Sequence, residues 1–297
     1  MFLVTGATDK VGQAVLAELT AKAVAVRVLV EDSSRLGPVG ANVEVMQADV
    51  ADEHSLKQAL AGVEAAFLAA PLGPKMTDFH ARFAEAAKSM HLPRIVQLSG
   101  VGADASLCCT RALRWLGQTE CTMRDFPCVT HLRPTFLMQI LLKFYSSVGQ
   151  HGLIAGPFRS GKWTFVDGRD VGAVAAAALT DAKYAGQTLT VTGSEELTYT
   201  EVAERLSKVL DRPVKYVDIT ANEARGRLQT YGVSPVMIEA LLELWDACAS
   251  KLVNVAPTSV VKDVTGREPR TLEQFALDYR EYFIKTPAPV LPRIAEG

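Results

Sequence analysis

The sequence predicts an α/β fold in which a doubly wound parallel sheet is followed by a smaller, mostly helical C-terminal region. Short apolar runs alternate with helix-length segments through the first half of the 297-residue chain, as right-handed βαβ units require. The runs are continuous and do not alternate polar with apolar residues, which indicates strands buried on both faces of a sheet. In addition, the first run leads through a glycine-containing turn into a helix.

The expected elements follow in order along the chain. Strands are expected at residues 2–5, 24–30, 43–47, 65–70, 94–99, 128–133 and 188–192. Helices are expected over residues 11–22, 53–60, 77–90, 107–125, 171–181, 198–210, 222–230, 235–251 and 271–283. The glycine-rich stretch 151–170 carries only short strand signals and is expected to be a loop region that wraps the sheet.

Composition and charge exclude several classes of protein. The net charge is −2 and the pI about 6.2, so the chain lacks the basic surface that direct binding to nucleic acid needs. No apolar stretch reaches the ~18 residues of a membrane span. No basic segment precedes the first apolar run, so a cytoplasmic protein without a signal peptide is expected. The five cysteines include no C-x-x-C pair, which argues against a metal site or a disulfide framework.

The segment TGATDKVG, which starts at Thr5, has the features of a phosphate-binding turn. A dinucleotide site needs backbone close to the pyrophosphate and a helix N-terminus directed at its negative charge. Gly6 is placed for the tight turn, and Gly12 for close packing of the helix on the strand. Because the turn belongs to a βαβ unit, a dinucleotide site of the Rossmann type is predicted. Its expected contacts here are Gly6, Thr8, Asp9, Lys10, Val11 and Gly12.

Asp9 stands where such a turn most often has a glycine that faces the phosphates. A carboxylate at this position repels a pyrophosphate, and its side chain holds the ligand away from the backbone. Either Lys10 offsets this charge, or Asp9 turns to solvent and caps the helix. The prediction is a weakened or reshaped cofactor site, and the alternative is a glycine turn that binds no ligand.

Residues at the ends of the next strands complete the predicted site. Glu31 follows the second strand, where an acid hydrogen-bonds the adenosine ribose and repels a 2′-phosphate, so NAD is slightly favoured over NADP. The alternative is a solvated Glu31, with Arg35 available to a phosphate. The carboxyl ends of parallel strands line the ligand crevice. Further contacts are therefore expected at Asp49, Val50, Ala69, Ala70, Pro71, Ser99 and Gly100.

These positions divide the chain by role. Residues 1–152 are expected to form the dinucleotide-binding domain, with sheet elements returning around 171–192. Residues 153–297 are expected to form the smaller region that holds and caps a substrate.

Several segments, in order, are similar to the NmrA-like family of atypical short-chain dehydrogenases, which includes NAD(P)H:quinone oxidoreductase-like proteins. They include TGATDKVG, RIVQLSGVGA, THLRPTFLMQ, FVDGRDVGAVAAAAL and TGREPRTLEQFALDY, and the resemblance covers nearly the whole chain. It implies a Rossmann fold, an NAD(P) cofactor and a reductase. The chain departs from the family pattern at Asp9 for the middle glycine, Glu31 for an arginine, Leu116 for a histidine and Ile140 for an asparagine.

The sequence shows no dedicated acid–base pair. Ordinary short-chain dehydrogenases donate a proton from a Tyr-x-x-x-Lys pair, and residues 101–130 contain neither tyrosine nor lysine. Ser99 and Tyr145 remain as weak catalytic candidates. Quinone-like and conjugated acceptors do not need a dedicated proton donor, because the charge left by hydride transfer delocalises and water can supply the protons. For them a pocket that positions the acceptor and excludes bulk water suffices. The predicted pocket residues, for which core packing is the alternative, are Val101, Trp115, Phe136, Met138, Gln139 and Tyr145.

Two further polar groups are expected to have structural roles. His131 lies in a predicted strand and is expected to be a hydrogen-bonded core histidine. Asp167, Arg169 and Asp170 are expected to form a buried, salt-bridged corner that shapes the site.

Three functions remain open from the sequence. The first is an NAD(P)H-dependent oxidoreductase that transfers hydride to a small quinone-like, aromatic or conjugated substrate. The second is a non-catalytic dinucleotide sensor that regulates a protein partner. The third is a redox-neutral cyclase or isomerase with a degenerate cofactor site. A homodimer is compatible with each of them.

Overall fold

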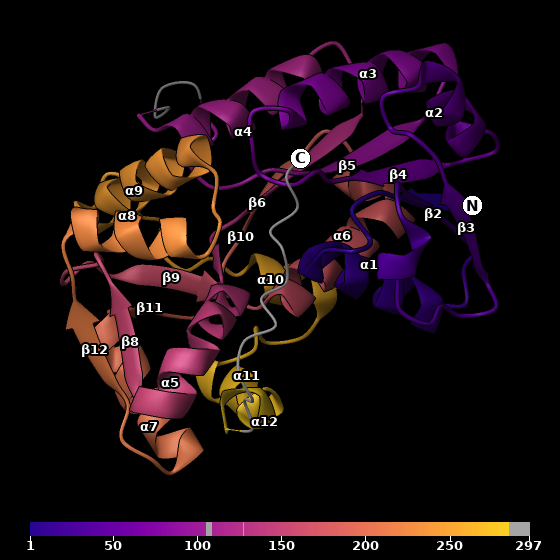
Figure 1. Ribbon diagram of the computed structural model, residues 1–297. Helices are drawn as coiled ribbons and strands as arrows, with labels where there is room; N and C mark the ends of the chain where they lie inside the picture. The colour runs from indigo at the N-terminus through magenta and orange to yellow at the C-terminus, as the bar shows by residue number, and fades with distance from the viewer. Residues whose placement is uncertain (105–108, 127, 285–297) are drawn as a thin grey trace.

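A computed structural model describes residues 1–104, 109–126 and 128–284. Within them a seven-stranded parallel sheet has the order β10-β6-β5-β4-β1-β2-β3 (Figure 1). Its strands are β1 (Phe2–Val4), β2 (Val26–Val30), β3 (Val43–Gln47), β4 (Ala65–Leu68), β5 (Arg94–Leu98), β6 (Val129–Pro134) and β10 (Thr188–Val191). The strand order reverses at β1, which confirms the predicted doubly wound arrangement.

Helices cover both faces of this sheet (Figure 1). One face carries α2 (Glu53–Leu60), α3 (Met76–Ser89) and α4 (Arg111–Thr122), and the other carries α1 (Lys10–Ala21), α6 (Gly168–Thr180) and α10 (Val260–Thr265). Successive strand residues point to opposite faces, so Val4 packs in the core beneath α1 and α6, and Leu3 in the core beneath α2 and α3. The helix expected over 107–125 is α4, and the first two residues of that range lie outside the described residues.

The edge strand β3 departs from the prediction that the strands are buried on both faces. β3 is half-buried to exposed along its length, and Val45 keeps 39% of its surface. The cause is position, because β3 pairs only with β2 and forms an edge of the sheet. Inner strands such as β1 and β4 are fully buried, as predicted.

The C-terminal part contains more strand than predicted. The stretch 151–170, expected as a loop region, holds β8 (Leu153–Gly156) and β9 (Trp163–Val166). These strands build two small sheets, of order β11-β9-β7 and β12-β8, with β7 (Phe136–Leu137), β11 (Glu196–Leu197) and β12 (Lys215–Asp218). Partner strands from distant parts of the chain form these sheets, so local sequence gives only weak signals for them.

Helices make up the rest of the C-terminal part. They are α5 (Tyr145–His151), α7 (Tyr199–Leu210), α8 (Ala221–Thr230), α9 (Pro235–Ala249), α11 (Leu272–Asp278) and α12 (Arg280–Ile284). The single helix expected over 271–283 is therefore two helices, divided at Tyr279. Short 3₁₀ turns occur at η1 (Ser33–Arg35), η3 (Met138–Phe144) and η4 (Ala182–Tyr184). An aromatic core joins these elements, in which Phe158 stacks on Tyr199 with ring centroids 3.9 Å apart.

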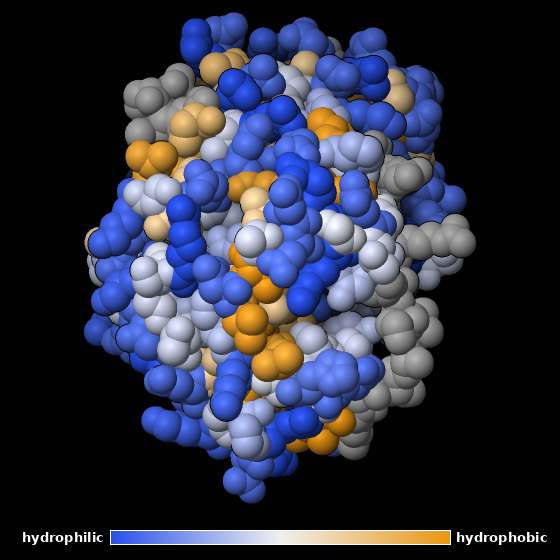
Figure 2. Space-filling view, turned by 60° about the vertical axis from the view of Figure 1, so that its left-hand side comes forward, coloured by the Kyte–Doolittle hydropathy of each residue, from blue (hydrophilic) through white to orange (hydrophobic). Residues whose placement is uncertain are grey.

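Hydrophobic side chains also reach the surface. On the face shown in Figure 2 they gather in a strip that runs down the middle, with hydrophilic residues on both sides. In the described part of the C-terminal region, the exposed large hydrophobic residues are Val217, Tyr231, Val236, Leu252, Leu277, Tyr282 and Ile284. No helix among the described residues is both long enough and apolar enough to cross a membrane.

A buried ionic corner ties α6 to the C-terminal helices, as predicted. The Asp167 carboxylate caps α6 by accepting from the Arg169 backbone N–H at 2.9 Å, and it is fully buried against the Arg169 guanidinium at 2.7 Å. Arg169 also pairs with Asp278 at the end of α11, at 2.5 Å. Asp170 accepts from the backbone N–H of Arg270 at 2.7 Å and pairs with its guanidinium. Burial favours a higher pKa for Asp167, but hydrogen bonds from Arg169 and Gln139 outweigh it and hold the pKa below its usual value.

Replacing Asp167 with asparagine tests this corner. At pH 7 we expect Asp167→Asn to lower the free energy of unfolding by about 3 kcal/mol, because Arg169 loses its buried partner. The folded-state pKa of Asp167 is depressed, so the stabilisation is present above the unfolded pKa near 4 and is lost as pH falls through the folded value. Urea unfolding of both proteins between pH 7 and pH 3 should therefore show their difference shrinking in acid. A difference that stays constant over this range would contradict the assignment.

Candidate functional site

The turn between β1 and α1 is built so tightly that only glycine fits at two of its positions. Gly6 has φ +65°, and a Cβ there would lie 3.1 Å from the Cβ of Ala69. A Cβ on Gly12 would lie 2.1 Å from the carbonyl oxygen of Gly6. A Cβ on Gly12 would clash with that oxygen, and residues that carry a Cβ rarely adopt the positive φ of Gly6, so both glycines are required for α1 to approach β1 this closely. The first turn of α1 consequently lies at the carboxyl end of β1.

The hydroxyl of Thr5 fixes this turn to the neighbouring strand. Thr5 Oγ1 accepts from the backbone N–H of Ala69 at 2.8 Å and donates to the Ala69 carbonyl at 3.0 Å. Thr5 is 2% exposed, so these bonds are protected from water. They join the ends of β1 and β4, the point at which the strand order reverses.

Asp9 occupies the N-cap position of α1 without capping it. Its side chain accepts no hydrogen bond from the helix, whereas Asp52 accepts two backbone N–H groups at the start of α2 and Asp167 accepts one at the start of α6. The first backbone N–H groups of a helix have no intrahelical partner. Those of α1 therefore remain available to an anion, and the interpretation of Asp9 as a hydrogen-bonding cap is wrong.

The charge of Asp9 is only partly compensated. The Asp9 side chain lies at the surface, but the surrounding protein reduces its hydration and raises its pKa above the usual value. The positive charge of Arg35 opposes that rise. Arg35 belongs to η1, after β2, so the electrostatic interaction joins the turns that follow β1 and β2.

The other predicted cofactor residues lie along the same edge of the sheet. Glu31 is exposed directly after β2. Asp49 follows β3, where its carboxylate accepts from the backbone N–H of Ala51 at 2.7 Å. Residues at the remaining positions follow β3, β4 and β5 and run from half-buried or buried to exposed: Val50, Ala69, Ala70, Pro71, Ser99 and Gly100.

Ser99 belongs to a hydrogen-bonded network that the sequence analysis missed. Its hydroxyl donates to Oε1 of Glu120, on α4, at 2.6 Å. Arg133, on β6, donates to both oxygens of the same carboxylate, from Nε at 2.9 Å and from Nη2 at 2.6 Å. Burial favours a higher pKa for Glu120, but the hydrogen bonds from Arg133 and Ser99 outweigh it and lower the pKa. A signal was present, because an arginine in an inner strand needs a carboxylate on the helix that covers it.

His131 lies beside this network in β6. Its Nδ1 is 2.8 Å from Oε1 of Gln97, and burial lowers its pKa. The prediction of a hydrogen-bonded histidine is confirmed, although the ring is half-buried and not fully within the core. Among the described residues, no group of three His, Cys, Asp or Glu side chains could hold a metal ion.

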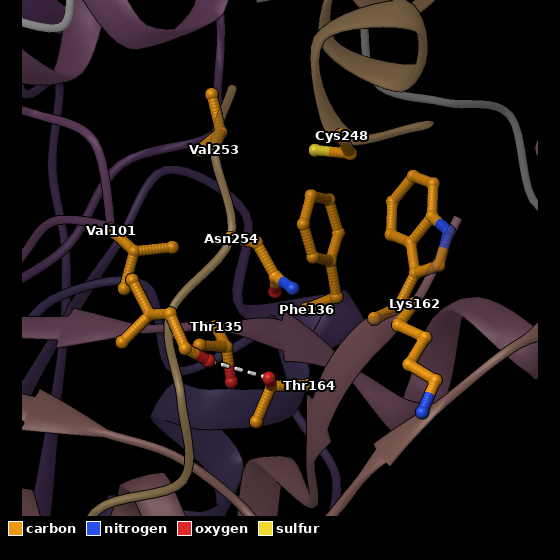
Figure 3. A pocket seen from close by; sticks show the side chains of 10 residues that line it. Val101, Thr135, Phe136, Lys162, Thr164, Cys248, Val253 and Asn254 are labelled. Carbon is orange, nitrogen blue, oxygen red and sulfur yellow. Dashed lines mark hydrogen bonds between the residues drawn. The ribbon is translucent and has the colours of Figure 1, made fainter. Parts of the chain in front are cut away.

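A small cavity lies beyond the ends of β5 and β6 (Figure 3). Its volume is about 10 Å³, which is room for about one water molecule. Two predicted pocket residues, Val101 and Phe136, line it. Thr135, next to Phe136, also lines it, and the other lining residues come from later parts of the chain: Lys162, Trp163, Thr164, Cys248, Val253, Asn254 and Val255.

The remaining predicted pocket residues lie elsewhere. Met138 packs in the aromatic core of the C-terminal part. Gln139 is buried in the ionic corner, where it donates to Asp167 at 2.9 Å and accepts from the Gly168 N–H at 2.9 Å. Tyr145 packs against Tyr282 with ring centroids 5.0 Å apart, and Trp115 is half-buried on α4.

Comparison with known proteins relates nearly the whole chain to one family and to reductases. The model of the NmrA-like family matches residues 1–276. An NAD(P)H azoreductase of Xenophilus azovorans is 33% identical over 281 residues, which cover 93% of this chain and 96% of the relative. A (4-alkanoyl-5-oxo-2,5-dihydrofuran-3-yl)methyl phosphate reductase of Streptomyces griseus subsp. griseus is 32% identical, covering 95% of this chain and 99% of the relative.

A solved structure supports the fold. The NADPH-dependent quinone oxidoreductase of Escherichia coli, determined with NADPH, superposes with a TM-score of 0.83 over 94% of this chain and 99% of that one, at 22% identity. Nearly the full length of the chain thus matches in both sequence and fold. With its glycine turn, its reversed strand order and this match, the chain belongs to the NmrA-like family.

Proposed function

We propose that this protein is an NAD(P)H-dependent reductase that transfers hydride to small quinone-like, aromatic or conjugated acceptors. The observation that carries the proposal is the uncapped N-terminus of α1, held by Gly6 and Gly12 at the point where the strand order reverses. The reductase names of the Xenophilus azovorans and Streptomyces griseus relatives, at 33% and 32% identity, support it.

The residues of the turn fit a nicotinamide dinucleotide. Gly6 and Gly12 let α1 approach β1 closely, and the Asp9 side chain does not cap the first backbone N–H groups of α1, which would therefore be available to a pyrophosphate. Glu31 is exposed at the end of β2, where it would contact the adenosine ribose. In this assignment residues 1–152 hold the cofactor, which supplies hydride, and residues 153–297 complete the substrate pocket.

The proposed acceptor class follows from the contacts of the two candidate proton donors, Ser99 and Tyr145. The Ser99 proton is already donated to Glu120 at 2.6 Å, and Tyr145 packs against Tyr282 in place of lining the cavity. An acceptor that delocalises charge needs no dedicated proton donor and takes its protons from water. Val101, Phe136 and Val253 line the small cavity, and once it widens they would contact such a flat acceptor and exclude bulk water near the hydride.

Binding and turnover assays test this function. Protein purified without added cofactor is titrated with NADH and NADPH while tryptophan fluorescence is followed, and cofactor oxidation is then monitored with a panel of quinones and azo compounds. We expect micromolar binding of at least one dinucleotide and acceptor-dependent oxidation. Binding without oxidation of any acceptor would favour a dinucleotide-sensing regulator. If neither dinucleotide binds, the reductase and the dinucleotide-sensing regulator are both excluded, and a redox-neutral enzyme remains.

Removing the side chain of Asp9 should strengthen the cofactor site. We expect Asp9→Gly to lower the dissociation constant of NADH about threefold to tenfold, because two unit charges near 4 Å repel by about 1 kcal/mol even in water. Fluorescence titration measures the change. Asp9→Asn keeps the size and removes the charge, so it should reproduce most of the gain. An unchanged constant in both variants would contradict the electrostatic argument.

The same variants give a pH signature. The pKa of Asp9 is raised, so its carboxylate gains a proton earlier than usual as pH falls. NADH, which has no 2′-phosphate to titrate, should therefore bind the natural protein more tightly at pH 5 than at pH 7. In Asp9→Asn this part of the pH dependence should disappear.

Glu31 is expected to set the choice between the two dinucleotides. Glu31→Arg should shift the ratio of NADH to NADPH dissociation constants about tenfold towards NADPH, because an arginine can pair with the 2′-phosphate. Glu85→Arg makes the same charge change on the exposed surface of α3 and should leave the ratio unchanged. If both variants behave alike, Glu31 is only a solvated acid.

A further inference from the structure

The carboxylate of Glu120 is held in one arrangement by two neighbours. Its side chain is 11% exposed, and Arg133 binds it in a bidentate manner from β6. Ser99 adds a third hydrogen bond to Oε1 at 2.6 Å. Bidentate arginine–carboxylate pairs fix geometry as well as charge. The position of the carboxylate is therefore set by the sheet and does not depend on Ser99.

This arrangement decides the direction of the Ser99 hydroxyl. An ionised carboxylate can only accept hydrogen bonds, so the proton of Ser99 must point at Glu120. The oxygen of Ser99 keeps two lone pairs, and no donor from the described residues contacts it. Ser99 is 6% exposed, so little water reaches it. Ser99 is thus prepared to accept a hydrogen bond and is not free to donate one.

The place of Ser99 indicates which donor it meets. It directly follows β5, in the half of the sheet opposite Glu31, and Val101, two residues later, lines the cavity. A dinucleotide that lies across the reversal point with its adenosine over β2 has its nicotinamide over this half. The amide of the nicotinamide carries two N–H donors.

We propose that Glu120 and Arg133 are positioning residues that make Ser99 a hydrogen-bond acceptor for the carboxamide N–H of the nicotinamide ring. The proposal rests on the proposed function, since it assumes that the crevice holds a nicotinamide cofactor. It gives Ser99 a role in orienting the ring and assigns it none in proton donation. Glu120 acts through Ser99 and does not touch the cofactor.

A pair of ligands isolates this one hydrogen bond. NADH carries the carboxamide, and its 3-acetylpyridine analogue has a methyl group in place of the amide nitrogen, so it keeps the carbonyl and loses the donor. Dissociation constants for both are measured by quenching of tryptophan fluorescence. The natural protein should bind NADH more tightly than the analogue. Ser99→Ala should reduce this preference about threefold to tenfold, the usual range for a single hydrogen bond, by weakening NADH alone.

Glu120→Gln tests the positioning role. The neutral amide no longer forces the serine proton towards it, so the preference for NADH should fall while binding of the analogue stays unchanged. Glu239→Gln is the matched control, because Glu239 forms the same kind of pair with Arg225, at 3.0 Å, between α8 and α9. Its preference should equal that of the natural protein. Thermal unfolding of each variant shows whether it is folded.

The outcomes separate this inference from the proposed function. If NADH binds but Ser99→Ala leaves the preference unchanged, the acceptor role is wrong and the reductase proposal stands. If Ser99→Ala lowers the preference and a folded Glu120→Gln does not, Glu120 is not a positioning residue. Should Glu120→Gln fail to fold, Ser99→Ala alone still decides the acceptor role. If the natural protein binds neither ligand, both proposals are wrong.

Discussion

The close approach of α1 to β1 is the constraint on which the rest of the site depends. With 2.1 Å between the Gly6 carbonyl oxygen and the place of a Cβ on Gly12, the helix begins almost in contact with the strand that it follows. The first N–H groups of α1 therefore face the crevice at the point of strand reversal, instead of lying a side chain's width away. The position of Asp9 and its interaction with Arg35 are consequences of this placement.

The local parts of this structure could be predicted from the sequence, and the parts that depend on distant residues could not. The apolar runs around Val28 and Ile95 belong to inner strands with both faces covered, whereas β3 contains Glu44 and Gln47 and lies at an edge. β8 and β9 form only because β12, β7 and β11 pair with them. No helix-breaking residue in the sequence signals the division of the last helix at Tyr279.

In the candidate site, too, the parts formed by neighbouring residues could be predicted and the parts formed by distant residues could not. The glycine turn is contiguous, so the tight turn at Gly6 and the close helix packing at Gly12 could be predicted from spacing. Glu120, the partner of Ser99, lies 21 residues away in sequence, and Arg133, the partner of Glu120, lies 34 residues from Ser99, on a helix and a strand that only the folded sheet brings together. Cys248, near the end of α9, and Asn254, after it, both line the cavity, and their residue types alone predict nothing about that position. The sequence predicts Gln139 as a pocket residue, whereas in the structure it lies in the ionic corner and its side-chain amide donates a hydrogen bond to Asp167.

The size of the cavity beyond β5 and β6 bears on how fast the protein can work. A space of about 10 Å³ cannot admit a ring, so the side chains that line the cavity must separate before any aromatic acceptor could bind there. The fraction of molecules in that separated form multiplies the intrinsic association constant of every such acceptor. Acceptors of quite different shape would then share one kinetic step. Their saturation behaviour would report the stiffness of the cavity lining as much as their own chemistry.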